Sequence, residues 1–463
     1  MEKLSRRIRY VLRISSLMEP MWLNLIMLVS LVLRLALVPF IYPHHSDEVW
    51  QYLEPAYHLI EGQGTITWEQ RAGMRSWLIP VLVAVPMRLG HAIDPMGMAH
   101  IMAVQVAAAL LSLLMVWGFY VLGKRISEMH GLICACVAAA WSEIVYMSPR
   151  SLSEPMSAAT FVAGTALLLS NGKRSAYAIA AGFLLGLAFL FRIQHGPAIA
   201  ALLVVAISHY RFAPVLLGGL LAVLADSIAN MALGAPPLQW IWLNFEANLL
   251  QARSADYGVQ PAWYYLVDLI LRWNVFAMPI AILAVLGARR YPAIAAALLV
   301  HFVVHSLIPH KEWRFQYLAI VLILLLAALG TGVVITHWQG AIRKPVLLCG
   351  AATAWAAASV VAIISPGLPA SAQLDLKGIQ MAMVEIARKP STCPIAVVGQ
   401  RHAIGASYVL LNRPRRIYHF RGDRLQDFPA YSNAVGTIVT DAARLRALPP
   451  QFSAIKCFTA KSP

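Results

Sequence analysis

The sequence predicts an all-α polytopic membrane protein with a small α/β domain at its C-terminal end. Of the 463 residues, 59% are apolar and only 13% are charged, whereas soluble domains carry about 25% charged residues. Residues 95–123, 315–342 and 345–374 contain no Asp, Glu, Lys or Arg. About 20 apolar residues are enough for a helix to cross a bilayer, so each stretch can hold one span. Most of the chain must therefore face lipid.

The net charge is +16, and the positions of the basic residues indicate the membrane topology. Lys and Arg form short clusters between apolar segments, as the positive-inside rule expects, and this pattern disfavours a nucleic-acid-binding surface. The N-terminus lacks the short apolar core and small-residue cleavage site of a secretory signal. Five basic residues precede the first apolar run, namely Lys3, Arg6, Arg7, Arg9 and Arg13. We therefore expect a cytoplasmic N-terminus and an uncleaved first helix.

The later basic clusters all lie inside if the chain crosses the membrane about eleven times. The predicted spans are 22–41, 98–122, 129–147, 153–170, 175–191, 196–209, 213–232, 273–288, 291–308, 317–336 and 345–364. The apolar stretch 77–89 is short and contains Pro80 and Pro86. A crossing there would invert every later cluster, so we interpret it as a re-entrant or interfacial segment.

This topology divides the chain into a transmembrane domain at 1–365 and an outer domain at 366–463. The transmembrane domain exposes a first outer loop at 42–97, a second at 233–272 and a tight turn at 309–314. The outer domain is expected to contain an amphipathic helix at 371–388 and β-rich runs at 395–399, 417–420 and 437–440, which is typical of a small α/β domain.

Two observations concern the compartment of the outer domain. Cys393 and Cys457 flank it, and in an oxidising compartment they could pair as a disulfide. The chain has no Asn-x-Ser/Thr sequon, which agrees with a bacterial inner membrane and a periplasmic outer domain.

The first outer loop is acidic. Residues 42–70 contain no Lys or Arg and carry Asp47, Glu48, Glu54, Glu61 and Glu69. A carboxylate next to the lipid headgroups can act as the general base of a sugar transfer, because it can take the proton of the attacking hydroxyl. Two other interpretations remain open: a solvated loop that caps helices, and a divalent metal site formed by His44, His45 and two acids.

Cations and polar aromatics occupy the other outer segments. In the turn His310-Lys311-Glu312-Trp313-Arg314, Lys and Arg can hold a phosphate or extend toward lipid headgroups. Further candidate arginines are Arg75, Arg150 and Arg192, and Arg34 within the first span should face a cavity or pair with a carboxylate. The second loop combines Asn244, Asn248, Tyr257, Trp263 and Tyr264, which suits sugar binding or membrane anchoring.

These segments together resemble the family 22 glycosyltransferases, which include the mannosyltransferases of glycosylphosphatidylinositol and of lipid-linked oligosaccharide assembly. The first-loop pattern of the family is matched by His45-Ser46-Asp47-Glu48, Gln51, Glu54, Thr67-Trp68-Glu69 and Arg75-Ser76. The later patterns are matched by Arg150, by Asn244, Phe245, Asn248, Tyr257, Gly258, Trp263 and Tyr264, and by His310, Lys311, Glu312, Arg314 and Phe315. Ser46 replaces a family proline, and the C-terminal domain has no counterpart that we recognise.

The resemblance implies a GT-C fold and inverting transfer of a sugar, mannose above all, from a polyprenyl phosphate to a lipid-linked glycan or glycolipid. It implies that Asp47 is the general base and that Glu48 orients it. The implied donor-phosphate ligands are His310, Lys311, Arg314 and Arg150. The implied substrate-binding residues are Glu54, Trp68, Glu69, Arg75, Asn244, Asn248 and Tyr257. No cofactor is required by the resemblance, and a divalent metal is left open.

Two other functional classes, a transporter and a non-catalytic scaffold, predict different features. A transporter or flippase of a lipid-linked glycan should show repeated halves and polar sites near mid-membrane, whereas here the acids and aromatics gather in the outer loops. A non-catalytic membrane scaffold with an outer binding domain would tolerate the loss of Asp47, and an enzyme would not.

Overall fold

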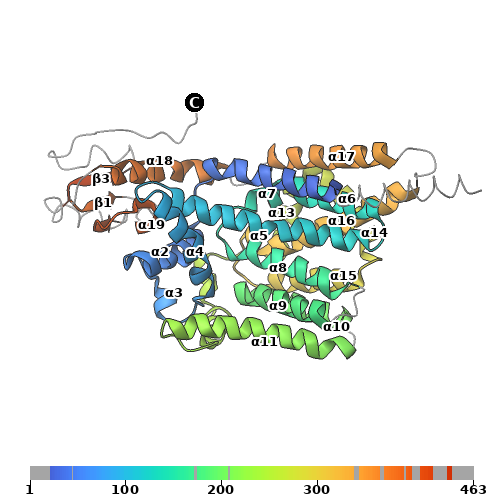
Figure 1. Ribbon diagram of the computed structural model, residues 1–463, viewed down its shortest axis with the longest axis horizontal. Helices are drawn as coiled ribbons and strands as arrows, with labels where there is room; N and C mark the ends of the chain where they lie inside the picture. Colours follow the sequence, from blue (N-terminus) through green and yellow to red (C-terminus); the bar gives the residue numbers. More distant parts are fainter. Residues whose placement is uncertain are drawn as a thin grey trace, which may run out of the picture.

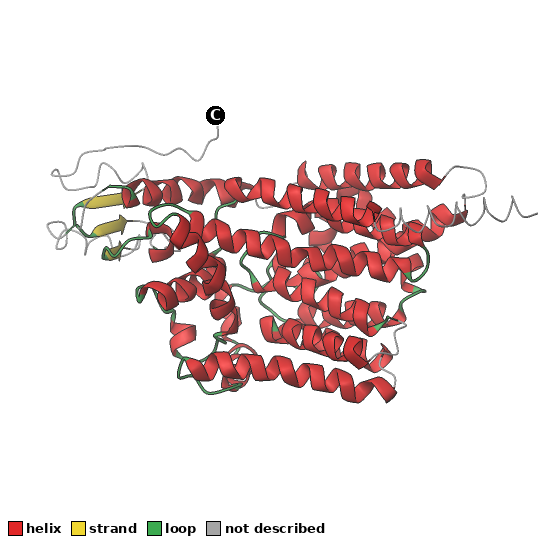
Figure 2. Ribbon diagram, viewed as in Figure 1, coloured by secondary structure: helices red, strands yellow, loops and turns green. Residues whose placement is uncertain are grey.

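The computed structural model describes residues 21–43, 45–170, 175–206, 209–337, 344–364, 370–389, 393–398, 407–420 and 435–440. It is a bundle of roughly aligned helices with a small sheet at one end (Figure 1). Figure 2 shows that helices make up most of the described chain and that the strands gather at that end.

The long helices follow the predicted spans closely. After the first helix (residues 21–37) they are α5 (Ala99–Lys124), α6 (Glu128–Ala140), α8 (Ser153–Leu168), α9 (Ser175–Phe191), α10 (Gly196–Ala206), α11 (His209–Ala232), α14 (Ala277–Ala288), α15 (Pro292–Leu307), α16 (Tyr317–His337) and α17 (Lys344–Ile364). The helices between these spans are α2 (Glu54–Glu61), α3 (Trp68–Arg71), α4 (Leu78–Ile93), α7 (Ser142–Met147), α12 (Gln239–Phe245) and α13 (Tyr264–Trp273). The described part of each predicted span is thus mainly helical, with a break at Trp141 in the span 129–147.

Six described helical segments are long and apolar enough to cross a membrane, and the chain is an integral membrane protein. They are Met21–Phe40, Ala99–Lys124, Phe212–Ala232, Tyr264–Ala288, Trp313–His337 and Pro345–Ala362. The uncharged run around α16 is the most enclosed of them, because the other helices surround it. The full number of crossings stays a prediction.

Arg34 explains why the predicted span 129–147 is broken. The backbone of Trp141 is extended and separates α6 from α7. The Arg34 guanidinium donates to the carbonyl oxygens of Ala138 (3.0 Å) and Ala139 (3.1 Å) at the end of α6, and its Nε donates to serine hydroxyls. Among the described residues Arg34 has no carboxylate partner, so that expectation is wrong. Its charge is instead met by carbonyl groups at a helix end, which carry partial negative charge.

Small residues allow close contact between helices α9 and α11. A Cβ atom on Gly182 of α9 would lie 1.9 Å from the carbonyl oxygen of Val215, and one on Gly218 of α11 would lie 1.9 Å from that of Ile179. Backbones in membrane bundles approach this closely where glycine leaves room. Gly182 and Gly218 therefore allow the backbones of α9 and α11 to pack closely together. The C-terminal end of α11 lies at the predicted outer end of the bundle.

Residues 77–89 form α4, a helix of 16 residues (Leu78–Ile93). Pro80 lies in its first turn, where proline is tolerated, and Pro86 lies inside it. Figure 1 places α4 beside α2 and α3, at the end of the bundle that carries the sheet. Its interfacial or re-entrant position in a membrane stays a prediction.

The C-terminal domain has the predicted α/β character. Helix α18 (Ala370–Ala387) precedes strands β1 (Ile395–Val398), β2 (Ile417–Phe420) and β3 (Thr437–Thr440), and the short α19 (Tyr408–Leu411) lies between β1 and β2. The strands form a parallel sheet in the order β2-β1-β3, with Ile395 opposite Ile417 and Thr437. Cys457 lies outside the described residues, so its disulfide with Cys393 stays a prediction.

Candidate active site

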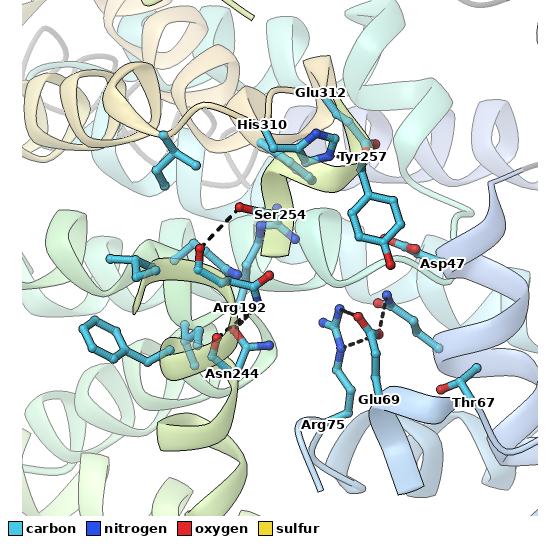
Figure 3. Close-up of a pocket in the computed structure, with 18 of the residues that line it drawn as sticks. Asp47, Thr67, Glu69, Arg75, Arg192, Asn244, Ser254, Tyr257, His310 and Glu312 are labelled. Atoms are coloured by element: carbon cyan, nitrogen blue, oxygen red, sulfur yellow. Dashed lines mark hydrogen bonds and ion pairs between the residues drawn. The ribbon is translucent and has the colours of Figure 1, made fainter. Parts of the chain in front are cut away.

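A cavity of about 1660 Å³ lies where the predicted outer loops meet. Its lining residues fall within segments 46–51, 65–75, 189–197, 238–265 and 304–315, and Tyr408, Ile417 and His419 of the C-terminal domain complete it. Figure 3 shows acidic, basic and aromatic side chains converging on this space. The predicted outer segments are therefore brought together around one site.

Arg314 is the electrostatic centre of the site. Its guanidinium contacts three carboxylates: Nη2 to Asp47 Oδ2 at 2.5 Å, Nη1 to Glu154 Oε1 at 2.6 Å, and Nε to Glu312 Oε2 at 2.7 Å. The planar fork of arginine allows these contacts at once. Burial alone would raise the pKa of Asp47, but Arg314 and then His45 hold it below its ordinary value. Asp47 is therefore ionised at neutral pH and can accept a proton.

Glu312 gathers two histidines on the same side. Its Oε2 lies 3.1 Å from His45 Nε2, and its Oε1 lies 3.3 Å from His310 Nε2. The hydrogen bond to Glu312 raises the pKa of His310. His310 Nδ1 also lies 3.0 Å from the carbonyl oxygen of Gly258, so the turn at 309–314 and the second outer loop are joined beside the cavity.

Glu154, which the sequence analysis did not single out, bridges two arginines. Its Oε1 also contacts Arg192 Nη1 at 3.0 Å, and its side chain is fully buried. Glu154 lies in the first turn of α8, where the helix dipole favours an acid. An acid followed by proline at the start of an apolar helix was the available signal. Arg192 follows α9 and lines the cavity.

Three buried histidines lie next to Arg192. The ring centroids of His195 and His301 are 5.1 Å apart, and those of His301 and His305 are 4.0 Å apart. His301 and His305 are four residues apart on α15, a spacing that puts them on one helix face, and His305 lines the cavity. Within the described ranges, no group of three His, Cys, Asp or Glu side chains is placed to hold a metal ion.

Glu48 and Arg150 are not brought to the cavity. Arg150 Nη1 lies 3.3 Å from Glu48 Oε2, and both side chains are fully buried. Glu48 also accepts hydrogen bonds from the backbone and hydroxyl of Ser151. Glu48 begins a π-helical segment (Glu48–Leu53) that follows Asp47, and consecutive side chains of a helix point to different sides, so Glu48 faces away when Asp47 faces the cavity. Neither residue lines the cavity, and their roles in orienting Asp47 and in binding phosphate stay predictions.

Lys311 and Glu54 do not line the cavity either, because their side chains are bound to backbone groups around it. Lys311 Nζ donates to the carbonyl oxygens of Gln260 (3.1 Å) and Ile308 (2.5 Å), so it ties the turn to the second loop. Glu54 accepts hydrogen bonds from backbone amides of the first loop and of the C-terminal domain. The polar groups of both side chains are used by contacts that shape the walls of the cavity. Neither side chain lies in the cavity lining, where we expected it.

The other predicted substrate-binding residues do line the cavity. Glu69 and Arg75 form a bidentate pair, with Nε to Oε2 at 3.0 Å and Nη2 to Oε1 at 3.3 Å, as Figure 3 shows. Asn248 Nδ2 donates to the carbonyl oxygen of Asn244 at 3.1 Å. The remaining two, Trp68 and Tyr257, present partly exposed aromatic rings. Burial, Glu69 and Asp47 raise the pKa of Tyr257, which therefore remains a hydroxyl donor.

Known proteins resemble this chain in sequence and in fold. It is 25% identical over 289 residues to the human GPI alpha-1,2-mannosyltransferase 3, covering 58% of this chain and 50% of that protein. It is 28% identical over 314 residues to GPI mannosyltransferase 3 of Drosophila melanogaster, covering 63% and 53%. The chain thus spans about half the length of these curated relatives.

Structural similarity extends over nearly the whole chain. The crystal structure of ArnT from Cupriavidus metallidurans, bound to undecaprenyl phosphate, superposes with a TM-score of 0.61 at 12% identity and covers 93% of this chain and 95% of that one. The expected GT-C fold is thereby confirmed. The family model of the Alg9-like mannosyltransferases matches residues 25–368. Because this match takes in most of the chain, including every outer segment that lines the cavity before the C-terminal domain, the chain belongs to the Alg9-like mannosyltransferase family.

Proposed function

We propose that this chain is an inverting glycosyltransferase that moves mannose from a polyprenyl-phosphate donor to a hydroxyl of a lipid-linked glycan or glycolipid. The observation that carries the proposal is Asp47, an ionised carboxylate in a large cavity, held by the buried Arg314. The names of the relatives support the sugar, and the ligand of the ArnT structure supports a polyprenyl phosphate as the carrier.

The reaction needs one base and no covalent intermediate. The acceptor hydroxyl attacks the anomeric carbon of the donor sugar while the bond from that carbon to the phosphate oxygen breaks. The proton of the hydroxyl passes to Asp47, and the electron pair of the broken bond leaves with the polyprenyl phosphate. Attack opposite the leaving group inverts the anomeric centre. Arg314, rather than Glu48, is proposed to orient Asp47, since it contacts that carboxylate directly.

The donor phosphate is proposed to bind beside Arg192 and His305, with His310 nearby. Arg192 Nε is buried and has no hydrogen-bond partner among the residues that the structure describes, and both Arg192 and His305 line the cavity. Phosphate oxygens satisfy such donors, and arginine suits them particularly well. These residues replace Arg150 and Lys311 of the sequence-based prediction, because neither of those two lines the cavity.

The cavity is proposed to open on the extracytoplasmic face, in a bacterial inner membrane. Leu307, at the end of α15, lines the cavity. The basic pair Arg289–Arg290 lies before the other end of that helix, about 24 Å away for 16 residues. The positive-inside rule then puts the pair in the cytoplasm and the cavity outside.

The test is sugar transfer by the purified protein in detergent. Wild type, Asp47→Asn and Asp256→Asn receive polyprenyl-phosphate [¹⁴C]mannose and a membrane lipid extract, and label is followed into new lipid products. Loss of the base should reduce transfer by about 10²–10⁴-fold. Asp256→Asn makes the same chemical change at an exposed residue outside the cavity lining and should transfer normally.

Two results would contradict the proposal. Equal transfer by wild type and Asp47→Asn would remove Asp47 from the mechanism. Absence of transfer by the wild type with mannose and with other polyprenyl-phosphate sugars, together with movement of labelled lipid across proteoliposomes, would favour the flippase instead.

A further inference from the structure

The family match ends at residue 368. Residues that follow it in the chain nevertheless line the cavity. Tyr408 of α19 and Ile417 and His419 of β2 line the same space as Asp47. Alternate residues of a strand point to opposite faces, so Ile417 and His419 face the cavity while Tyr418 and Phe420 join the apolar cluster of the sheet. Part of the site is therefore built by sequence that lies outside the family match.

The C-terminal domain is held to the first outer loop by buried polar contacts. Glu54, fully buried, accepts hydrogen bonds from the backbone amides of Val409 (2.7 Å) and Thr65 (2.6 Å). The carbonyl oxygen of Val409 lies 2.6 Å from His100 Nε2. Both backbone polar groups of one residue are thus bound by the transmembrane domain, and unpaired buried groups are costly. These contacts favour the observed position of the domain over positions that would leave the groups unpaired.

A second set of contacts holds the other end of α19. Asn412 Nδ2 donates to the carbonyl oxygens of Pro95 (3.0 Å) and Gly97 (3.2 Å). With the Glu54 contacts, these fix α19 at both its ends. Thr65, which shares Glu54 with Val409, itself lines the cavity, so the position of Tyr408 is coupled to that of the wall at 65–68.

We propose that the C-terminal domain is the acceptor-selecting wall of the cavity and that it contacts an uncharged sugar ring of the acceptor. The proposal rests on the proposed function. The donor phosphate is proposed to bind the cation Arg192, whereas the described lining residues of the C-terminal domain are an aromatic, an imidazole and an aliphatic side chain. Rings of this kind pack on the apolar face of a sugar, and an anionic headgroup would call for Lys or Arg.

The test separates acceptor from donor. Tyr408→Ala and His419→Ala are assayed with polyprenyl-phosphate [¹⁴C]mannose, with a membrane lipid extract as the acceptor pool, and each is varied in turn. The apparent KM for the extract should rise about tenfold, the effect of one lost ring contact, while the KM for the donor stays within twofold. Tyr177→Ala is the matched control, because Tyr177 is exposed near the start of α9, whose other end approaches the cavity.

The charge of the bound group is tested at Ile417. For an uncharged sugar, Ile417→Lys and Ile417→Glu should both raise the acceptor KM. A lower KM in Ile417→Lys alone would overturn the uncharged class and indicate an anionic group. Unfolding midpoints of all variants within a few degrees of wild type exclude misfolding, and His419→Ala provides a second readout if Tyr408→Ala does not fold.

The outcomes distinguish this inference from the proposed function. Transfer by the wild type with no change of acceptor KM in either wall variant, or a change in donor KM instead, would overturn the acceptor wall and leave the enzyme intact. If the wild type transfers no sugar, the proposed function fails and the acceptor wall fails with it.

Discussion

Replacing Glu154 with Gln should expose how the site balances its charge. The carboxylate is fully buried and contacts Arg314 Nη1 at 2.6 Å and Arg192 Nη1 at 3.0 Å. Arg314 keeps Asp47 and Glu312 after the change. Arg192, whose side chain is 9% exposed, keeps no carboxylate among its described contacts. The substitution therefore leaves one buried guanidinium without a counter-ion.

The expected loss of stability is about 3 kcal/mol, the low end for breaking a buried ion pair, because Arg314 remains paired. At about 2 °C per kcal/mol for a long chain, the unfolding midpoint should fall by roughly 6 °C. A bound phosphate would restore a negative charge beside Arg192. Undecaprenyl phosphate should therefore raise the midpoint of Glu154→Gln by more than it raises that of the wild type.

The assay is thermal unfolding of the detergent-purified protein with and without undecaprenyl phosphate. The control is Glu128→Gln, which removes the carboxylate of a partly exposed pair with Lys124 (27% and 44% exposed side chains). Such pairs contribute about 1 kcal/mol or less. If Glu154→Gln unfolds like Glu128→Gln, the importance assigned to the buried bridge is wrong. If undecaprenyl phosphate stabilises the variant no more than the wild type, Arg192 does not bind the phosphate.

Two further predictions concern pH and packing. Burial raises the pKa of Glu54 from 4.5 to about 7, which means that the folded state disfavours the ionised carboxylate. The free energy of unfolding should therefore fall by about 3 kcal/mol as the pH rises from 4.5 to about 7. Glu54→Gln should flatten this dependence, and unfolding midpoints at pH 5 and pH 8 test it; an unchanged slope would contradict the assignment. Gly182→Leu should abolish a stable monodisperse protein, because its Cβ would lie 1.9 Å from the carbonyl oxygen of Val215. Gly350→Leu, with nothing within 4 Å of the added Cβ, should leave size-exclusion behaviour unchanged, and equal behaviour of the two would refute the packing argument.

The elements of this protein were predictable because their signals are local. Charge-free runs predicted the long helices, and short β-rich runs predicted β2 at 417–420 and β3 at 437–440. The failures arose where distant groups intervene. Nothing near residue 141 reveals that Arg34 would take the carbonyls at the end of α6, since the two segments are more than 100 residues apart.

The type of candidate site was predictable from the sequence, but only some of the residues that form it were. Asp47, Glu69, Arg75 and Tyr257 share the cavity as expected. Glu154 was missed because its importance comes from Arg314, a partner 160 residues away in the chain.

The sequence by itself determined the membrane class, the helices, the C-terminal strands and the family motifs, because each depends on composition or on spacing within a few residues. Only the tertiary structure decided which motif residues face one another. A motif states which residues are adjacent along the chain, but neighbouring side chains on a helix point to different sides. Asp47 and Glu48 therefore face a cavity and a buried arginine respectively, and the C-terminal domain becomes a wall of the site because backbone hydrogen bonds to Glu54 hold it there.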